Sequence, residues 1–147
     1  PELLVCDEAV AALDVSVQAQ IINLLMDIRQ ESGLSMIFIS HDLGLIRHLC
    51  DRVAVMYLGR VVELAKTSEL FANPVHPYTQ MLLAGMPRIS TERRTFMPIK
   101  GEIPSPLNPP SGCHFHPRCD RATDHCRILR PDLREKGSGH LHACLNA

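Results

Sequence analysis

The sequence predicts an α/β fold followed by a loop-rich C-terminal extension that contains cysteines. Two short apolar runs, at 3–6 and 35–39, flank a segment with helical periodicity. A third run at 52–57 follows a shorter helical segment, so strands and helices alternate as they do in a parallel sheet with right-handed crossovers. From residue 87 onward, prolines and glycines leave little room for long regular elements.

The first helix is predicted between Asp14 and Gly33. Asp14 or Ser16 can cap its start, and Gly33 can end it. A second, shorter helix is expected at 43–50, between the second and third strands. Five apolar residues of the first helix recur at helical spacing: Val17, Ile21, Leu24, Leu25 and Ile28.

A hairpin and two further short helices are expected after the third strand. The chain turns at Leu58-Gly59, and 60–64 can then pair antiparallel with the strand that precedes the turn. Between Thr67 and Met86 the two helices are broken around Asn73-Pro74. The second helix opens with His76-Pro77-Tyr78, because proline is tolerated in a first helical turn.

Three ionisable residues stand directly after predicted strands. Asp7 and Glu8 follow the first strand and His41 follows the second, so all three are expected at one edge of the sheet. A hard cation that bridges nucleotide phosphates needs a fixed oxygen ligand, which Asp7 can supply. Glu8 can polarise an attacking water, and His41 can hydrogen-bond the γ-phosphate. Taken singly, each residue is more often an ordinary strand end or turn residue.

The ordered set is more specific than its parts. Asp7-Glu8 is followed by Ala12-Leu13-Asp14, a helix, a strand and Ser40-His41-Asp42, and this series resembles the ATPase subunit of ATP-binding-cassette transporters. The resemblance implies a P-loop NTPase (RecA-like) core, with Asp7 and Glu8 as the Walker B pair, Asp14 in the D-loop and His41 as the switch histidine. It also implies ATP and Mg²⁺ as ligands. One departure is Ala9, where the family usually has proline.

The phosphate-binding half of such a site is missing from the sequence. No glycine-rich Walker A loop and no Ser-Gly-Gly-Gln signature occur, and the pair Lys66-Thr67 lacks the glycines. Without a backbone nest and a lysine to cradle phosphates, nucleotide affinity is expected to be largely lost. We therefore expect a truncated core, namely the C-terminal part of a longer subunit, that does not turn over ATP by itself.

Further segments resemble the dipeptide and oligopeptide importers of this family. They are the stretch from Asn73 to Thr79, Gly-Glu-Ile-Pro-Ser-Pro at 101–106 and Asn-Pro-Pro-Ser-Gly-Cys at 108–113. The resemblance implies a second ATPase subunit, homologous or identical, transmembrane permease subunits and, indirectly, a substrate-binding protein. It implies a peripheral position on the cytoplasmic side of the cell membrane. Two domains are expected: 1–86 from the nucleotide-binding domain, and the extension at 87–147.

Four of the six cysteines lie in the last third of the chain, with spacings Cys-x5-Cys-x6-Cys-x17-Cys. Disulfides are disfavoured in a reducing cytosol. Zn²⁺ suits the ligand type but the tight Cys-x2-Cys pairs are absent, and an iron-sulfur cluster suits separated thiolates as well. The spacing alone does not decide between zinc and iron. Five histidines crowd the same region and most are expected not to be ligands: His114, His116, His125, His140 and His142.

The family resemblance implies a 4Fe-4S cluster with a structural role. The ligands carried over are Cys113, Cys119, Cys126 and Cys144. The other two cysteines, Cys6 and Cys50, are expected to be small core residues.

Composition limits the alternatives. Hydrophobic residues make up 46% of the chain, charged residues 21%, and the formal net charge is -1, which gives no electrostatic case for nucleic acid or an anionic membrane surface. No uninterrupted apolar stretch of about 20 residues is present. A metal-stabilised protein-interaction module without ATPase activity stays open as the alternative function.

Overall fold

The computed structural model describes residues 1–86 and 101–147; the first part of the predicted loop-rich segment, 87–100, lies outside the described residues. The chain divides into two compact units, residues 1–50 and 51–147. Within the described ranges, no helix combines the length and the apolar character needed to cross a membrane.

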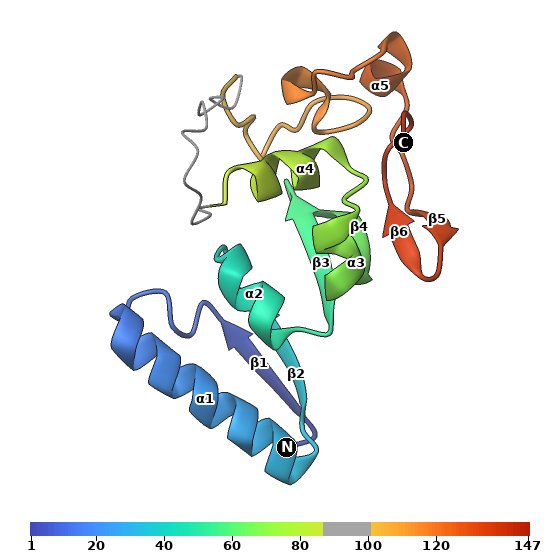
Figure 1. The fold of residues 1–147 in the computed structure, drawn as a ribbon. Coiled ribbons are helices and arrows are strands. Elements are labelled where there is room, and N and C mark those ends of the chain that lie inside the picture. Colours follow the sequence, from blue (N-terminus) through green and yellow to red (C-terminus); the bar gives the residue numbers. More distant parts are fainter. Residues whose placement is uncertain (87–100) are drawn as a thin grey trace, which may run out of the picture. The chain divides into compact units, whose positions relative to one another are not determined.

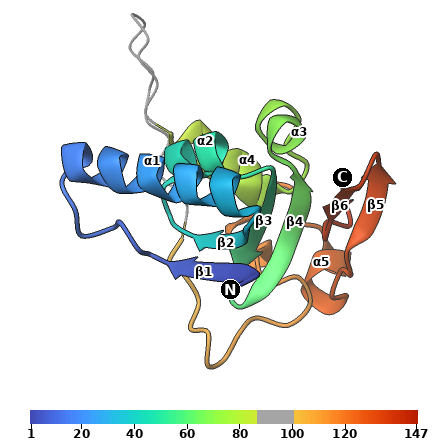
Figure 2. The same ribbon diagram turned by 90° about the horizontal axis from the view of Figure 1, so that it is seen from below.

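The unit formed by residues 1–50 contains the predicted crossover between parallel strands. Strands β1 (Leu3–Asp7) and β2 (Ser35–Ile39) pair in parallel, and α1 (Val15–Ser32) connects them. Figures 1 and 2 both show α1 running alongside the two strands. A short helix, α2 (Leu43–Leu49), follows β2, as the sequence predicts.

Local signals in the sequence fix both ends of α1. The side chain of Asp14 accepts hydrogen bonds from the backbone N–H groups of Ser16 and Val17, which satisfies two of the donors left free at a helix start. Gly33 ends the helix at φ 62°, a left-handed conformation that glycine adopts without strain.

The unit formed by residues 51–147 is built on an antiparallel sheet with the strand order β3-β4-β6-β5. Its strands are β3 (Arg52–Tyr57), β4 (Arg60–Lys66), β5 (Arg134–Gly137) and β6 (His140–His142). The prediction that 52–57 continues the parallel sheet is wrong: among the described residues, β1 and β2 form a sheet of their own, and β3 belongs to the antiparallel sheet. The RecA-like core implied by the resemblance is therefore not confirmed beyond a mixed α/β structure.

The turn between β3 and β4 gives the physical reason for the antiparallel pairing. Leu58 and Gly59 both have positive φ, at 45° and 74°. A two-residue turn of this kind matches the twist of an antiparallel hairpin, so it folds the chain directly back along β3. The hairpin predicted at 60–64 is thereby confirmed and extends to Lys66.

Two short helices follow the hairpin, as predicted. They are α3 (Thr67–Ala72) and α4 (Pro77–Ala84), separated by the segment that contains Asn73 and Pro74. Figure 1 shows both beside the strands of the hairpin.

The C-terminal part of the chain has more regular structure than the sequence predicts. It contains a 3-10 turn, η1 (His116–Arg118), a helix, α5 (Asp124–Ile128), and the strands β5 and β6. β6 pairs with β4, with Glu63 opposite His142. The tail therefore completes the sheet of its unit.

Aromatic rings connect the tail to the hairpin and to α4. The ring centroids of Tyr57 and Tyr78 lie 4.7 Å apart, and the ring of Phe115 is 5.3 Å from Tyr57 and 5.4 Å from Tyr78. Phe115 and Tyr57 are buried. This three-ring cluster forms part of the core of the unit, since aromatic side chains bury the largest apolar areas.

Candidate functional site

Glu8 and His41 meet at the edge that follows β1 and β2. His41 Nδ1 and Glu8 Oε1 are 2.9 Å apart, and the side chains are 76% and 50% exposed. The backbone N–H of Glu8 donates to the carbonyl of Ile39 at 3.0 Å, which ties the two strand ends together. The structure thus brings together two of the residues that the sequence places at one edge.

The backbone at Glu8 is strained. Its φ is 47°, which is uncommon for a residue other than glycine and is found most often where the surrounding structure enforces it. Asp7, the preceding residue, is exposed at the end of β1.

The contact changes the protonation of His41. The hydrogen bond that the ring donates to Glu8 raises the pKa of the His41 imidazole, and the negative charge of the carboxylate raises it further. Asp42 contributes a smaller effect in the same direction. The protonated ring is therefore retained to higher pH than in an isolated histidine.

Asp14 has a structural role in this chain. Its carboxylate accepts from Ser16 Oγ at 2.6 Å and from the N–H groups of Ser16 and Val17 at 3.1 and 3.0 Å. These hydrogen bonds lower the pKa of the Asp14 carboxyl, and the one from the Ser16 side chain has the largest effect. The residue is a charged helix cap.

The four C-terminal cysteines line one pocket, which we call the cysteine pocket. Cys113 precedes η1, Cys119 follows it, Cys126 lies in α5 and Cys144 follows β6, and all four are free thiols. Among the described residues, no three His, Cys, Asp or Glu side chains are grouped so as to hold a metal ion. The four predicted ligands therefore line one pocket, but in this structure they are not arranged as a metal site.

Close backbone packing holds two of these segments together. The N–H of Cys113 donates to the carbonyl of Cys126 at 2.8 Å. Gly112 lies so near that an added Cβ would be 2.5 Å from that carbonyl oxygen, and its φ is 65°. Only glycine fits this position without displacing the backbone.

The pocket disfavours negative charge on its thiols. Burial is the main cause that raises the pKa of Cys113, Cys119 and Cys144, and the neighbouring cysteines add to the rise. The Cys126 sulfur has two polar neighbours, Thr123 Oγ1 at 3.4 Å and Asn146 Nδ2 at 3.5 Å. Four thiolates in this pocket need a positive charge to compensate them.

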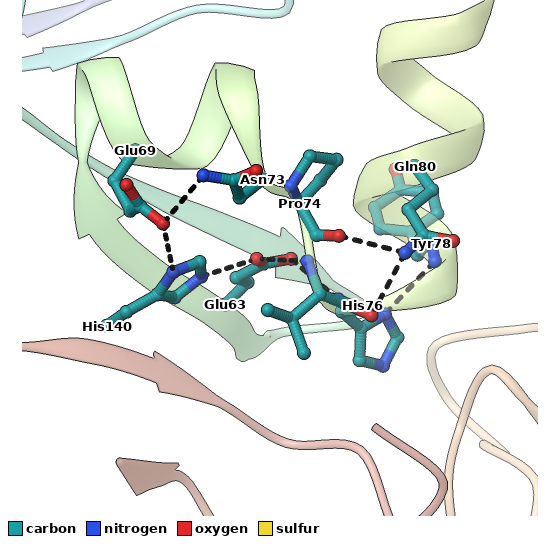
Figure 3. Close-up of polar contacts among 9 residues, drawn as sticks. Glu63, Glu69, Asn73, Pro74, His76, Tyr78, Gln80 and His140 are labelled. Carbon is teal, nitrogen blue, oxygen red and sulfur yellow. Dashed lines mark hydrogen bonds and ion pairs between the residues drawn. The ribbon is translucent and has the colours of Figure 1, made fainter. Parts of the chain in front are cut away.

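A buried carboxylate lies next to the pocket. Glu63 on β4 is 0% exposed, and it accepts hydrogen bonds from the backbone N–H groups of Val75 and His76 at 2.7 and 2.9 Å. Its Oε1 is also 2.7 Å from Nε2 of His140 on β6. Figure 3 shows the Glu63 carboxylate between the His140 ring and the backbone of His76. We call this the Glu63 network.

His76 belongs to both the network and the cysteine pocket. The residue is one of those that line the pocket, and it is almost fully buried. Nδ1 of the ring accepts a hydrogen bond from the N–H of Tyr78 at 3.1 Å, which caps α4. Burial lowers the pKa of His76 to about 4. The predicted helix start is confirmed, but the position of the residue at the pocket was not predicted.

The comparisons with known proteins agree with the sequence resemblance. Residues 62–126 match the model of the family described as oligopeptide/dipeptide transporter, C-terminal region. A probable peptide ABC transporter ATP-binding protein of Sinorhizobium fredii is 58% identical over 145 residues, covering 98% of this chain and 41% of the relative. Dipeptide transport ATP-binding proteins of Haemophilus influenzae and Escherichia coli are each 52% identical, covering 99% and 98% of this chain and 45% and 43% of their own length. The chain spans less than half the length of these relatives.

Replacing Glu63 by glutamine is expected to destabilise the unit formed by residues 51–147 by about 3 kcal/mol, because an amide N–H2 leaves at least one buried donor without an acceptor. Both tyrosines of the chain lie in this unit, and the chain contains no tryptophan. Tyrosine fluorescence during urea unfolding therefore reports on this unit. Glu69→Gln is the control, because Glu69 is half exposed and 3.9 Å from His140. Equal effects of the two substitutions would contradict the network.

Glu8→Gln is expected to lower the pKa of His41 toward its ordinary value, because it removes the charge that stabilises the protonated ring. A pH titration of the His41 ring by NMR measures this. Asp42→Asn is the matched control: asparagine also caps helices, and the expected decrease is smaller. An unchanged His41 titration in Glu8→Gln would show that the contact is not formed in solution.

Proposed function

Since the chain belongs to the family of peptide ABC transporter ATP-binding proteins, we propose that it acts within a subunit that couples ATP hydrolysis to peptide import. The observation that supports this most directly is the contact between Glu8 and His41 at the end of two parallel strands. The carboxylate and the imidazole approach each other there as a water-activating group and a phosphate-sensing group should.

Each residue of the edge has a role in this proposal. Glu8 orients or deprotonates the attacking water, and its carboxylate contacts His41. His41 uses Nδ1 toward Glu8, so Nε2 is available to donate to the γ-phosphate. Asp7 holds Mg²⁺ through water, and Asp14, besides capping α1, lies toward the second ATPase subunit.

The same proposal assigns the partners. The subunit pairs with a second ATPase subunit, identical or homologous, and binds permease subunits on the cytoplasmic side of the cell membrane, which receive substrate from a binding protein. The phosphate-binding loop has to come from residues outside this sequence, so we expect no ATP turnover by this chain alone.

In a complete subunit that contains this chain, Glu8→Gln is expected to reduce ATP turnover by about 100-fold or more, because a general base contributes that much to the rate. ATP binding should stay unchanged, since the carboxylate is not needed to hold the phosphates. Turnover and nucleotide affinity are measured on the same preparation, with the exposed Glu31→Gln on α1 as control. Unimpaired turnover in Glu8→Gln would refute the role of Glu8 and favour an interaction module without ATPase activity.

We further propose that the cysteine pocket holds a 4Fe-4S cluster, with Zn²⁺ as the alternative. The support is the donor set: four thiols from separate segments line one pocket, and burial leaves them needing positive charge. Each thiolate of such a cluster binds its own iron, so the ligands have to surround a pocket. The bound group supplies cross-links between loops and a site that can accept an electron.

Anaerobic purification of this chain is expected to give a brown protein with about four irons and four acid-labile sulfides per chain. Cys126→Ser should lose most of both, whereas Cys50→Ser, outside the pocket, should retain them. A colourless protein with stoichiometric zinc would show that the pocket is a zinc site and not a cluster site.

A further inference from the structure

Another cavity lies in the unit formed by residues 51–147, and we call it the Arg60 cavity. Its volume is about 280 Å³, close to the lower end of the range of about 300–1,000 Å³ that is usual for small-molecule sites. It borders the cysteine pocket, because His76, Cys113 and Phe115 line both. Its other lining residues have no role in the edge at Glu8 or in the proposed metal site.

Two residues that line the Arg60 cavity carry buried polar atoms without a partner. Across the described residues, Tyr57 Oη and His114 Nδ1 are among four buried side-chain atoms that form no hydrogen bond. Tyr57 is 5% exposed and His114 is 9% exposed, and both residues line the cavity. A buried polar atom without a partner is costly, and in native structures it usually indicates a missing partner.

The two atoms require different groups from a ligand. The ring of His114 hydrogen-bonds the backbone of Leu58, and because Nδ1 has no partner, this bond is made by Nε2–H. Nδ1 of the neutral ring therefore has a free lone pair and acts as an acceptor. The hydroxyl of Tyr57 can donate as well as accept. A ligand that satisfies both atoms supplies an N–H or O–H to His114 and an oxygen to Tyr57.

Three charged side chains also line the cavity, namely Arg60, Arg130 and Asp132. All three are exposed, and within the described part of the chain none of them forms an ion pair. Burial first, and then the charges of Arg60 and Arg130, lower the pKa of His114, which places both guanidinium groups within electrostatic reach of that ring. Guanidinium groups bind carboxylates, and a carboxylate binds an ammonium group. The lining therefore suits a ligand that carries both charges.

The inner lining of the Arg60 cavity is largely apolar. Val62, Phe115 and Ala143 line it and are buried. Sites for small molecules usually combine such an apolar wall with a few polar groups that fix the orientation of the ligand. The wall suits an apolar side chain of the ligand.

We propose that the Arg60 cavity binds a short zwitterionic peptide of the size of a dipeptide with an apolar side chain. Its carboxylate lies against Arg60 and Arg130, and its ammonium group lies against Asp132. The amide N–H donates to Nδ1 of His114, and the amide carbonyl accepts from the hydroxyl of Tyr57. A dipeptide is the smallest peptide that supplies all four groups. The inference rests on this cavity and not on the proposed ATPase or metal sites.

Calorimetric titration of this chain with leucyl-leucine tests the proposal. Leucyl-leucinamide lacks the carboxylate, and N-acetyl-leucyl-leucine lacks the ammonium group. We expect each to bind about fivefold more weakly than leucyl-leucine, because each loses one ion pair that solvent partly screens. Free leucine, which lacks the amide, is also expected to bind more weakly. The absence of saturable binding of leucyl-leucine, or an equal affinity for leucyl-leucinamide, would overturn the proposal.

Tyr57→Phe removes only the hydroxyl that has no partner. It is expected to weaken the binding of leucyl-leucine about fivefold, because one hydrogen bond is lost. Thermal unfolding of the ligand-free variant should show no loss of stability, since the hydroxyl forms no hydrogen bond there. Tyr78→Phe is the matched control, because Tyr78 belongs to the same ring cluster and is not among the lining residues. Equal effects of the two substitutions on binding would contradict the contact with Tyr57.

Arg130→Gln tests the position of the carboxylate. It should weaken the binding of leucyl-leucine and have little effect on leucyl-leucinamide, because the amide has no charge for Arg130 to bind. Arg127→Gln is the control, since Arg127 is exposed and does not line the cavity. An Arg130→Gln variant that weakens both ligands equally would overturn the placement of the carboxylate. Free leucine that binds as tightly as leucyl-leucine would overturn the assignment to a peptide.

Discussion

The buried carboxylate of Glu63 is the constraint on which the unit formed by residues 51–147 depends. Removing an anion from water costs several kcal/mol unless hydrogen-bond donors or charges replace the water. Here the donors are the backbone N–H groups of Val75 and His76 and the ring of His140. They belong to the segment between α3 and α4 and to β6, so satisfying one charge fixes three parts of the chain against one another. If α3, α4 or β6 moved away, the carboxylate would lose hydrogen-bond donors while it remained buried among apolar residues.

The hydrogen bonds of Glu63 also help to order the cysteine pocket. One donor of the network, His76, lines the pocket directly, and His140 anchors the strand that leads to Cys144. The contact between Cys113 and Cys126 through the backbone holds the other side. Part of the ordering cost of the pocket is therefore met by protein contacts. The metal or cluster that we propose for this pocket would add its binding energy to the stability of the tail, which has few long regular elements of its own.

Sequence signals were sufficient where they act over short distances. The cap at Asp14, the glycine at 33 and helical periodicity define α1, and the chain order of parallel strands brings Glu8 next to His41. The turn at Leu58-Gly59 predicted the hairpin of β3 with β4, but the apolar alternation of β3 does not specify which sheet the strand joins. β5 was missed because all four of its residues are exposed and no apolar pattern marks it. The buried carboxylate of Glu63 was not predicted; the signal for it is an acid inside the apolar run 61–65, but its donors lie 12 to 77 residues away in the sequence.

The two sites differ in what this chain provides by itself. The edge at Glu8 and His41 is exposed, and the residues that would cradle phosphates are not in the sequence. Glu8 and His41 can act on a phosphate group only when another part of the subunit holds that group opposite them. The cysteine pocket, in contrast, draws all four thiols from one compact unit. The proposed metal site can therefore be tested on this chain alone, whereas hydrolysis depends on residues that the sequence does not contain.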